Sequence, residues 1–249
     1  KTEQGDLGQV LGASQGDFER FIVAPTDALD AFNTIPELFN LVDKCQCPGI
    51  VISDLLISEG TFSVDPDDIN MRPKIDRGEL ISEASKTDGY LRYKDTESGI
   101  SPRALPGLDG HVHVVASDEH DEDGILISDE FTNPHKRRKM VEKRARKFQT
   151  VAQEVPPPEL EGPQDAEVTL IGWGSTYGVI REAIGVLAER GVVANQLAIK
   201  WLVPFHDEIV GGILSEANRV LIVENNYSGQ FARYLRSETG FAADGHIRK

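Results

Sequence analysis

The chain has 249 residues, enough for one large domain or two small ones. Its 41 acidic and 26 basic residues give a net charge of −15, which opposes non-specific binding to nucleic acid or to anionic membranes. No apolar run approaches the roughly 20 residues that cross a bilayer, and the first residues lack the apolar core of a secretory signal. Two cysteines do not make a disulfide scaffold, so a reducing, cytoplasmic setting is expected.

Residues 1–60 have the pattern of the end of an α/β domain. Residues 21–25 predict a short strand, and Thr26 is a suitable N-cap for the helix that follows. Pro36 should kink or interrupt that helix, and residues 48–54 are typical of a buried parallel strand. The helix has apolar residues at helical spacing, at Ala28, Phe32, Ile35, Phe39 and Val42. Because two strands do not form a stable sheet, we expect the remaining strands upstream or on a partner.

Residues 61–160 show little periodicity at first and then one strong helical pattern. Residues 61–135 predict an extended arm that lies against another surface, with short strands such as residues 111–115. Residues 136–154 predict a basic helix, and residues 155–163 predict a stiff Pro-rich linker. The apolar stripe expected on the helix consists of Val141, Ala145, Phe148 and Ala152.

Residues 161–249 alternate between strand and helix patterns, which predicts a βαβαβα unit with a parallel sheet. The expected strands are 167–172, 196–201 and 219–224, and the first expected helix spans 176–190. That helix carries an apolar face made of Val179, Ile180, Ala183, Ile184 and Leu187. The fold class expected for the chain is therefore α/β.

Glycines follow the first of these strands, at Gly172, Gly174 and Gly178. Their spacing is one residue longer than the dinucleotide-binding fingerprint, and the second strand lacks the acid that would hold a ribose. The pattern favours tight packing of strand against helix over nucleotide binding. After the last strand, Asn225 and Asn226 precede a helix expected to start near residue 228, where their amides can cap it or bond across a subunit boundary.

Candidate metal ligands occur in three places, and none forms a complete set. Residues 119–130 nearly match a calcium-binding EF-hand loop, but Glu119 is too long for the first position and Ile127 is a poor ligand at the ninth. The histidines at 111, 113 and 120 lack a further ligand at the spacing of a zinc motif. Cys45 and Cys47 have no second pair, so we interpret them as ordinary thiols. No metal site is expected in this chain.

Eight cations lie within the twelve residues 136–147. Such density is typical of nucleic-acid or phosphate binding, yet in so acidic a chain we expect these cations to face an acidic surface of the same assembly. No Ser-His-Asp order, P-loop or GxSxG elbow is present. With no catalytic residue assigned, the chain suits one subunit of a larger enzyme.

Several blocks, taken in order, resemble the alpha subunits of 2-oxoacid:ferredoxin oxidoreductases, most closely the 2-oxoglutarate type. They cover nearly the whole chain and are residues 1–7, 48–59, 93–107, 118–124, 139–144, 172–179 and 223–230. The resemblance implies the C-terminal portion of such a subunit. Residues 1–60 would be the end of the pyrimidine-binding-type domain of a thiamine diphosphate enzyme. Residues 61–160 would be the arm, basic helix and linker, and residues 161–249 a transketolase-C-like α/β domain.

The same resemblance implies an enzyme that decarboxylates a 2-oxoacid, reduces ferredoxin and delivers the acyl group to coenzyme A. Thiamine diphosphate, magnesium and an iron–sulfur cluster would lie mainly on a partner beta subunit, in a hetero-oligomer. Lys1 and Thr2 would bind the substrate, and Arg103, Asn225 and Asn226 would lie at an interface. The main alternative is a non-catalytic nucleotide-binding or regulatory module built on residues 172–178; another is a different thiamine-dependent enzyme.

Overall fold

The computed structural model describes residues 3–84, 89–127 and 133–248. A five-stranded sheet forms the C-terminal part, with the strand order β10-β9-β6-β7-β5. The strands are β5 (Leu160–Glu161), β6 (Val168–Trp173), β7 (Ala194–Ile199), β9 (Val220–Glu224) and β10 (Gly245–Arg248). All neighbours are parallel except β5, which pairs antiparallel with β7. The predicted parallel sheet is therefore confirmed.

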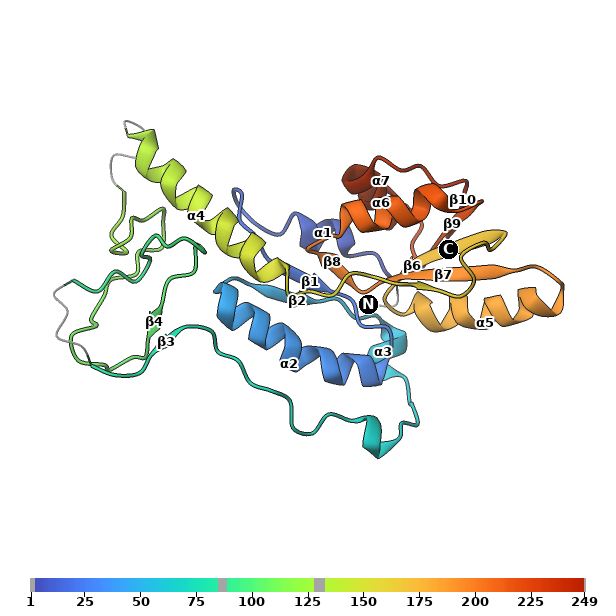
Figure 1. The fold of residues 1–249 in the computed structure, drawn as a ribbon, viewed down its shortest axis with the longest axis horizontal. Helices are drawn as coiled ribbons and strands as arrows, with labels where there is room; N and C mark the ends of the chain where they lie inside the picture. The colour runs from blue at the N-terminus through green and yellow to red at the C-terminus, as the bar shows by residue number, and fades with distance from the viewer. Residues whose placement is uncertain (1–2, 85–88, 128–132, 249) are drawn as a thin grey trace.

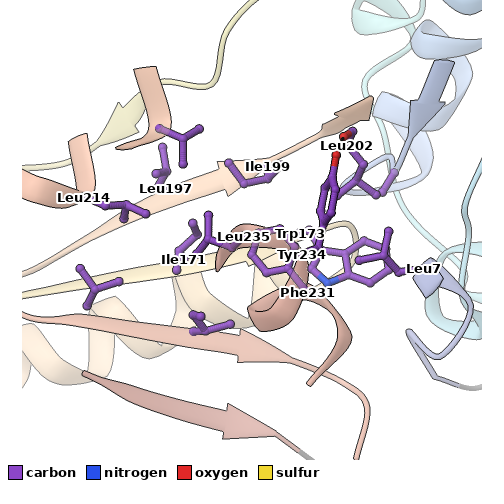
Figure 2. Close-up of a cluster of buried hydrophobic side chains, with 14 of the residues drawn as sticks. Leu7, Ile171, Trp173, Leu197, Ile199, Leu202, Leu214, Phe231, Tyr234 and Leu235 are labelled. Carbon is purple, nitrogen blue, oxygen red and sulfur yellow. Dashed lines mark hydrogen bonds between the residues drawn. The ribbon is translucent and has the colours of Figure 1, made fainter. Parts of the chain in front are cut away.

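Helices cover both faces of this sheet (Figure 1). Helix α5 (Thr176–Glu189) lies on one face, and α6 (Asp207–Glu216), α7 (Gln230–Thr239) and the short α1 (Leu7–Leu11) lie on the other. Figure 2 shows Leu7 of α1 beside Trp173 and Phe231, all three within the main hydrophobic core. Because Leu7 is fully buried there, the N-terminal segment is an integral part of the C-terminal core.

A second sheet has the order β2-β1-β8, formed by β1 (Phe21–Val23), β2 (Gly49–Val51) and β8 (Trp201–Val203). The parallel pairing of β1 with β2 agrees with the sequence. The expected burial of residues 48–54 is wrong for the observed strand, since β2 lies at the sheet edge and is exposed or half-buried. The third strand comes from this chain, because β8 follows β7 after Lys200 alone and pairs antiparallel with β1.

Helix α2 (Ala28–Cys45) packs against this sheet with a different face from the one expected. Its buried residues are Thr34, Leu38, Leu41 and Cys45. The expected stripe points outward instead: Phe32 is 48% exposed, Ile35 39% and Phe39 68%. Both stripes follow helical spacing, so the periodicity alone does not show which one meets the core.

The start of α2 also differs from the expectation. Asp27, not Thr26, is the N-cap, and its carboxylate accepts a hydrogen bond from the backbone N–H of Asp30 at 2.8 Å. The Asp30 carboxylate in turn accepts from the backbone N–H of Thr26 at 2.9 Å, a reciprocal capping arrangement. The helix continues through Pro36 without a break.

Residues 61–84 and 89–127 form the expected arm of mostly irregular structure. It contains a 3₁₀ turn (Pro66–Asp68) and the two-residue strands β3 (Leu80–Ile81) and β4 (Arg103–Ala104), and it follows the short helix α3 (Leu55–Glu59). The strand expected at residues 111–115 is wrong, since no strand forms there and Val112 is 93% exposed. An alternating pattern predicts a strand only where a neighbouring strand is available for pairing.

The basic helix is present as α4 (Pro134–Ala152). Phe148 is buried as expected, whereas Val141, Ala145 and Ala152 are only half-buried. The buried face consists of Met140, Lys143, Phe148 and Val151, so the true stripe is rotated from the expected one and includes a lysine. A buried lysine cannot be recognised from apolar spacing.

The end of α4 completes a second hydrophobic core. Phe148 packs on Phe21 with ring centroids 5.1 Å apart, and Phe21 meets Trp201 edge-on at 6.4 Å. These residues come from all three parts expected from the sequence, and Val151 and Val155 extend the cluster. The three-part division stays a prediction.

In the part of the chain that the structure describes, no helix has the length and apolar character needed to cross a membrane.

Candidate functional site

The candidate site lies at the carboxyl ends of β6 and β9, where the N-terminal segment meets the large sheet. Strand β6 connects through α5 to β7 on one side, and the chain later returns to place β9 on the other side of β6. The strand order therefore reverses between β6 and β9. In open parallel sheets, this reversal leaves a crevice in which ligands commonly bind.

Gln4 fills this crevice and is only 3% exposed. Its amide nitrogen donates to the Trp173 carbonyl at the end of β6 at 2.6 Å, and its amide oxygen accepts from the Asn225 N–H after β9 at 2.9 Å. Its backbone N–H donates to the Asn225 carbonyl at 2.8 Å. A single glutamine thus joins the ends of two neighbouring strands.

Asn226 and Glu224 extend this network to helix α7. The Asn226 amide nitrogen donates to the Gln4 carbonyl at 3.2 Å, while its oxygen accepts from the N–H groups of Gly229 and Gln230 at 2.7 and 3.2 Å. The buried Glu224 carboxylate accepts from the N–H of Phe231 at 2.9 Å. The first turn of α7 therefore has its free N–H groups satisfied by side chains, as the capping hypothesis for Asn226 requires.

Two glycines allow this packing. A Cβ atom on Gly172 would lie 2.5 Å from Thr176 Oγ1 and 2.6 Å from Ile180 Cδ1, so any larger residue would force these side chains of α5 away from β6. Gly174 has a φ of +56° and faces Gln4. The predicted tight strand-to-helix packing is confirmed. The crevice that a nucleotide pyrophosphate would need is occupied by Gln4, which argues against the nucleotide-binding alternative.

Asp54 and Ser175 form a second contact at the same edge. The Ser175 hydroxyl donates to the Asp54 carboxylate, and both residues are less than 9% exposed. Asp54 also caps α3 by accepting from the N–H of Ile57 at 3.3 Å. This pair links the end of the small sheet to the loop that follows β6, so both sheets meet at the crevice.

The expected site residues do not all lie in the same part of the structure. Lys1 and Thr2 lie outside the described residues and are separated from the buried Gln4 by Glu3. Asn225 and Asn226 lie in the crevice network, whereas Arg103 lies in the arm, where its guanidinium is 3.3 Å from the Asp43 carboxylate. The interface assignments of these three residues stay predictions.

Sequence reasoning missed the roles of Gln4, Asp54 and Glu224. Gln4 and Asp54 lie inside blocks that carry the family resemblance, and Glu224 ends a predicted strand. The contacts of Gln4 and Asp54 join segments more than 100 residues apart, so no local pattern reveals them. The partners of Glu224 are the N–H groups of the next helix, and an acid that ends a strand shortly before a helix could have indicated that capping role.

The acidic turn of residues 118–124 meets the basic helix α4. Arg144 forms a two-pronged ion pair with Glu119 at 2.8 Å, and Lys139 pairs with Glu122. These cations hold the pKa of both carboxyls below the ordinary value, against the opposing effect of burial. The expectation that the basic run faces an acidic surface is confirmed within this chain, and Glu119 is turned toward a cation rather than toward a calcium site.

Comparison with known proteins identifies the relatives of this chain. No protein-family model matches it. The alpha subunit of 2-oxoacid:ferredoxin oxidoreductase 2 from Aeropyrum pernix is 33% identical over 100% of this chain, which covers 38% of that protein. The 2-oxoglutarate oxidoreductase subunit KorA from Mycobacterium tuberculosis is 32% identical over 96% of this chain, which covers 35% of that protein.

A solved structure that resembles this chain belongs to an enzyme of the same kind as these relatives. It is the 2-oxoglutarate:ferredoxin oxidoreductase from Magnetococcus marinus with 2-oxoglutarate, coenzyme A and succinyl-CoA bound, which is 28% identical and has a TM-score of 0.83. The match covers 99% of this chain and 42% of that one. This chain is a homologue of the alpha subunits of 2-oxoacid:ferredoxin oxidoreductases. It spans less than half the length of these three relatives.

For this alpha-subunit homologue, the predicted α/β fold class is confirmed by the elements of the chain and by the solved relative that covers 99% of it. The solved relative aligns along the arm as well as the sheets, because 99% of the chain is covered. The arm is therefore part of the shared architecture.

The described residues of this homologue do not fit the metal groups that the family resemblance implies. They contain no cluster of three or more His, Cys, Asp or Glu side chains placed to hold a metal ion. The whole chain has only two cysteines, which are too few for the four thiolate ligands of a typical iron–sulfur cluster. Ligands for magnesium or a cluster would have to come from another chain or from residues outside those described.

Proposed function

We propose that this chain is part of the alpha subunit of an enzyme that oxidatively decarboxylates a 2-oxoacid to an acyl-CoA and passes the two electrons to ferredoxin. The observation that carries the proposal is the structural match, with a TM-score of 0.83 over 99% of this chain, to part of a 2-oxoglutarate:ferredoxin oxidoreductase. We favour 2-oxoglutarate as the substrate, since relatives named for it are similar over 96–97% of this chain.

Thiamine diphosphate, magnesium and an iron–sulfur cluster belong, in this proposal, mainly to a partner beta subunit, with coenzyme A as cosubstrate. The lack of a metal-binding cluster among the described residues supports this distribution. The outward apolar stripe of α2 supports a partner, because Phe39 alone is 68% exposed and large apolar side chains gathered on one helix face are typical of interfaces. We expect a cytoplasmic hetero-oligomer that binds neither nucleic acid nor membranes.

Substrate binding is assigned to Lys1 and Thr2. A 2-oxoacid carries a carboxylate beside the reacting carbonyl, and the enzyme must hold that carboxylate in one orientation. A lysine ammonium can do this through a charge-assisted hydrogen bond. The Gln4 network supports the assignment, because it fixes the backbone three residues after Lys1 at the carboxyl ends of two strands.

The test is to produce the whole enzyme with its beta subunit and follow ferredoxin reduction with 2-oxoglutarate, pyruvate or a branched-chain 2-oxoacid, with and without coenzyme A. We expect turnover that requires coenzyme A and is fastest with 2-oxoglutarate. Lys1→Met should raise the Michaelis constant for the 2-oxoacid or lower turnover, and unchanged constants would remove Lys1 from the substrate site. Absence of ferredoxin reduction together with saturable micromolar binding of NAD or ATP would favour the nucleotide-binding alternative.

A further inference from the structure

A cavity of about 270 Å³ lies between helix α4 and the arm, away from the crevice at the strand ends. Three of its lining residues are the cations Arg92, Lys143 and Lys147. Tyr93 and His120 form part of its wall, with their rings 3.9 Å apart. Arg92 also lies over the Tyr93 ring, 4.9 Å from its centroid. The cavity thus combines buried positive charge with a flat aromatic surface.

The three cations have no anionic partner among the residues that the structure describes. Lys143 is 4% exposed, and its ammonium donates to the Gly99 carbonyl at 2.8 Å. The ammonium of Lys147 donates to the Gln46 carbonyl at 2.8 Å. One terminal nitrogen of Arg92 is buried without any hydrogen-bond partner. Backbone carbonyls therefore compensate the charges of Lys143 and Lys147 in part. Arg92 keeps a buried N–H donor without a hydrogen-bond partner.

This arrangement differs from the rest of α4. Arg144 also lines the cavity, but its charge is balanced by the two-pronged pair with Glu119. Arg146 is paired with Asp95. Burying an ammonium or guanidinium without a counter-charge is costly, and three such groups around one cavity repel each other. An anion in the cavity would remove both penalties.

We propose that this cavity is a binding site for a dianionic oxyanion, the phosphate group of a small phosphorylated molecule or free phosphate. A guanidinium can bind two phosphate oxygens at once, and two ammonium groups supply point charges to the remaining oxygens. Arg92, Lys143 and Lys147 carry three positive charges, so a dianion balances more of this charge than a monoanion does. The site is independent of the proposed 2-oxoacid chemistry, so either can fail alone.

The direct test is calorimetric titration of the full chain with inorganic phosphate, pyrophosphate and succinate at constant ionic strength. We expect saturable binding of phosphate to one site, and at least tenfold weaker binding in Arg92→Met and Lys143→Met. Tighter binding of pyrophosphate would point to a phosphorylated ligand larger than phosphate, and phosphate alone would point to the free ion. No saturable binding, or binding of succinate without phosphate, would overturn the proposal.

Arg138→Met is the matched control, because Arg138 is an exposed cation on the same helix and does not line the cavity. Its phosphate affinity should equal that of the wild type. An equal loss in Arg138→Met and Arg92→Met would mean that only the overall charge of the helix attracts the anion, which would refute a defined site. If Lys143→Met does not fold, the phosphate affinities of Arg92→Met and Arg138→Met still show whether the cavity is a defined site.

Titration with pH gives a second readout. Burial, helped by the charge of Lys147, lowers the pKa of Lys143 to about 8, while Asp95 opposes the shift and Arg92 and Arg144 reinforce it. Between this value and the ordinary 10.5, the folded chain releases a proton that the unfolded chain retains, so the free protein gains stability as pH rises. A bound phosphate keeps Lys143 protonated. The rise in melting temperature caused by phosphate should therefore shrink above pH 8, and a constant rise through pH 10 would contradict the role of Lys143.

Discussion

Replacing Gln4 with alanine should separate the N-terminal segment from the large sheet. The substitution removes one donor and one acceptor, and it leaves the Trp173 carbonyl and the Asn225 N–H without these partners. The Trp173 carbonyl keeps the Thr176 hydroxyl as a donor at 2.8 Å, whereas the Asn225 N–H is left unsatisfied. A buried backbone group left unsatisfied costs about 1–3 kcal/mol, so the substitution should lower the free energy of unfolding by about 2 kcal/mol. For a chain of this size, that corresponds to a fall in melting temperature of roughly 4–8 °C.

Circular dichroism during thermal unfolding at pH 7 measures this shift, and hydrogen exchange locates it. The Asn225 amide should exchange much faster in Gln4→Ala, because its acceptor is gone. Gln9→Ala is the matched control, since Gln9 is exposed on α1. If Gln4→Ala melted within 2 °C of Gln9→Ala, with unchanged exchange at Asn225, the crevice network would not stabilise the chain, contrary to the argument made from its burial.

Three further predictions concern the same region and the arm. Asn226→Ala should lower the free energy of unfolding by about 2 kcal/mol in chemical denaturation, because its amide caps α7; lost turnover with intact assembly and cofactor binding would contradict this structural role. Gly172→Ala should cost about 1–3 kcal/mol by the same measurement, since its Cβ would overlap Thr176; an unchanged midpoint would show that β6 and α5 can separate freely. Calorimetry should detect no calcium binding to residues 119–130 tighter than about 10⁻⁴ M, because Glu119 is held by an arginine.

The C-terminal sheet could be predicted because its elements follow simple periods. Strand β6 is buried along all of its six residues, and a mostly apolar run such as Val168, Leu170, Ile171 and Trp173 is typical of such a strand. The glycine spacing and the lack of a ribose-binding acid favour tight packing of strand against helix at the loop after β6, and that packing is observed at Gly172. Local pattern is sufficient here because the central strands β6 and β7 pair over all six residues of each.

Helix α2 shows where local pattern fails. It carries two apolar stripes, and the one that looked stronger, with Phe32 and Phe39, is exposed in this chain. Which stripe is buried depends on the position of α4 and β1, more than a hundred residues apart in sequence. A pattern measures amphipathic character, whereas the direction of burial is a property of the complete fold.

The third strand of the small sheet is not predicted, for a related reason. The sequence indicates that residues 1–60 need further strands and expects them upstream or on a partner, which stays a prediction. One further strand comes from this chain itself: β8, which follows β7 after Lys200 alone and pairs with β1. Residues 196–201 appeared as one strand because nothing in the apolar run marks a change of sheet. The Lys200 ammonium pairs with Asp30 at 2.6 Å and stabilises that change of direction.

Five of the cations of α4 fall into two groups with different roles. Those nearest the acidic turn are balanced: Lys136, Lys139 and Arg144 each pair with a carboxylate of residues 119–122. Such pairs at half-exposed positions contribute little net stability, so their main effect is to hold the turn against the helix. The balance also removes these charges from the field that a ligand would experience. Lys143 and Lys147 remain as cations without a paired carboxylate among the described residues, and both line the cavity. Because the acidic turn neutralises the neighbouring cations, the attraction for an anion is greatest at the cavity. This holds even though the chain as a whole carries a charge of −15.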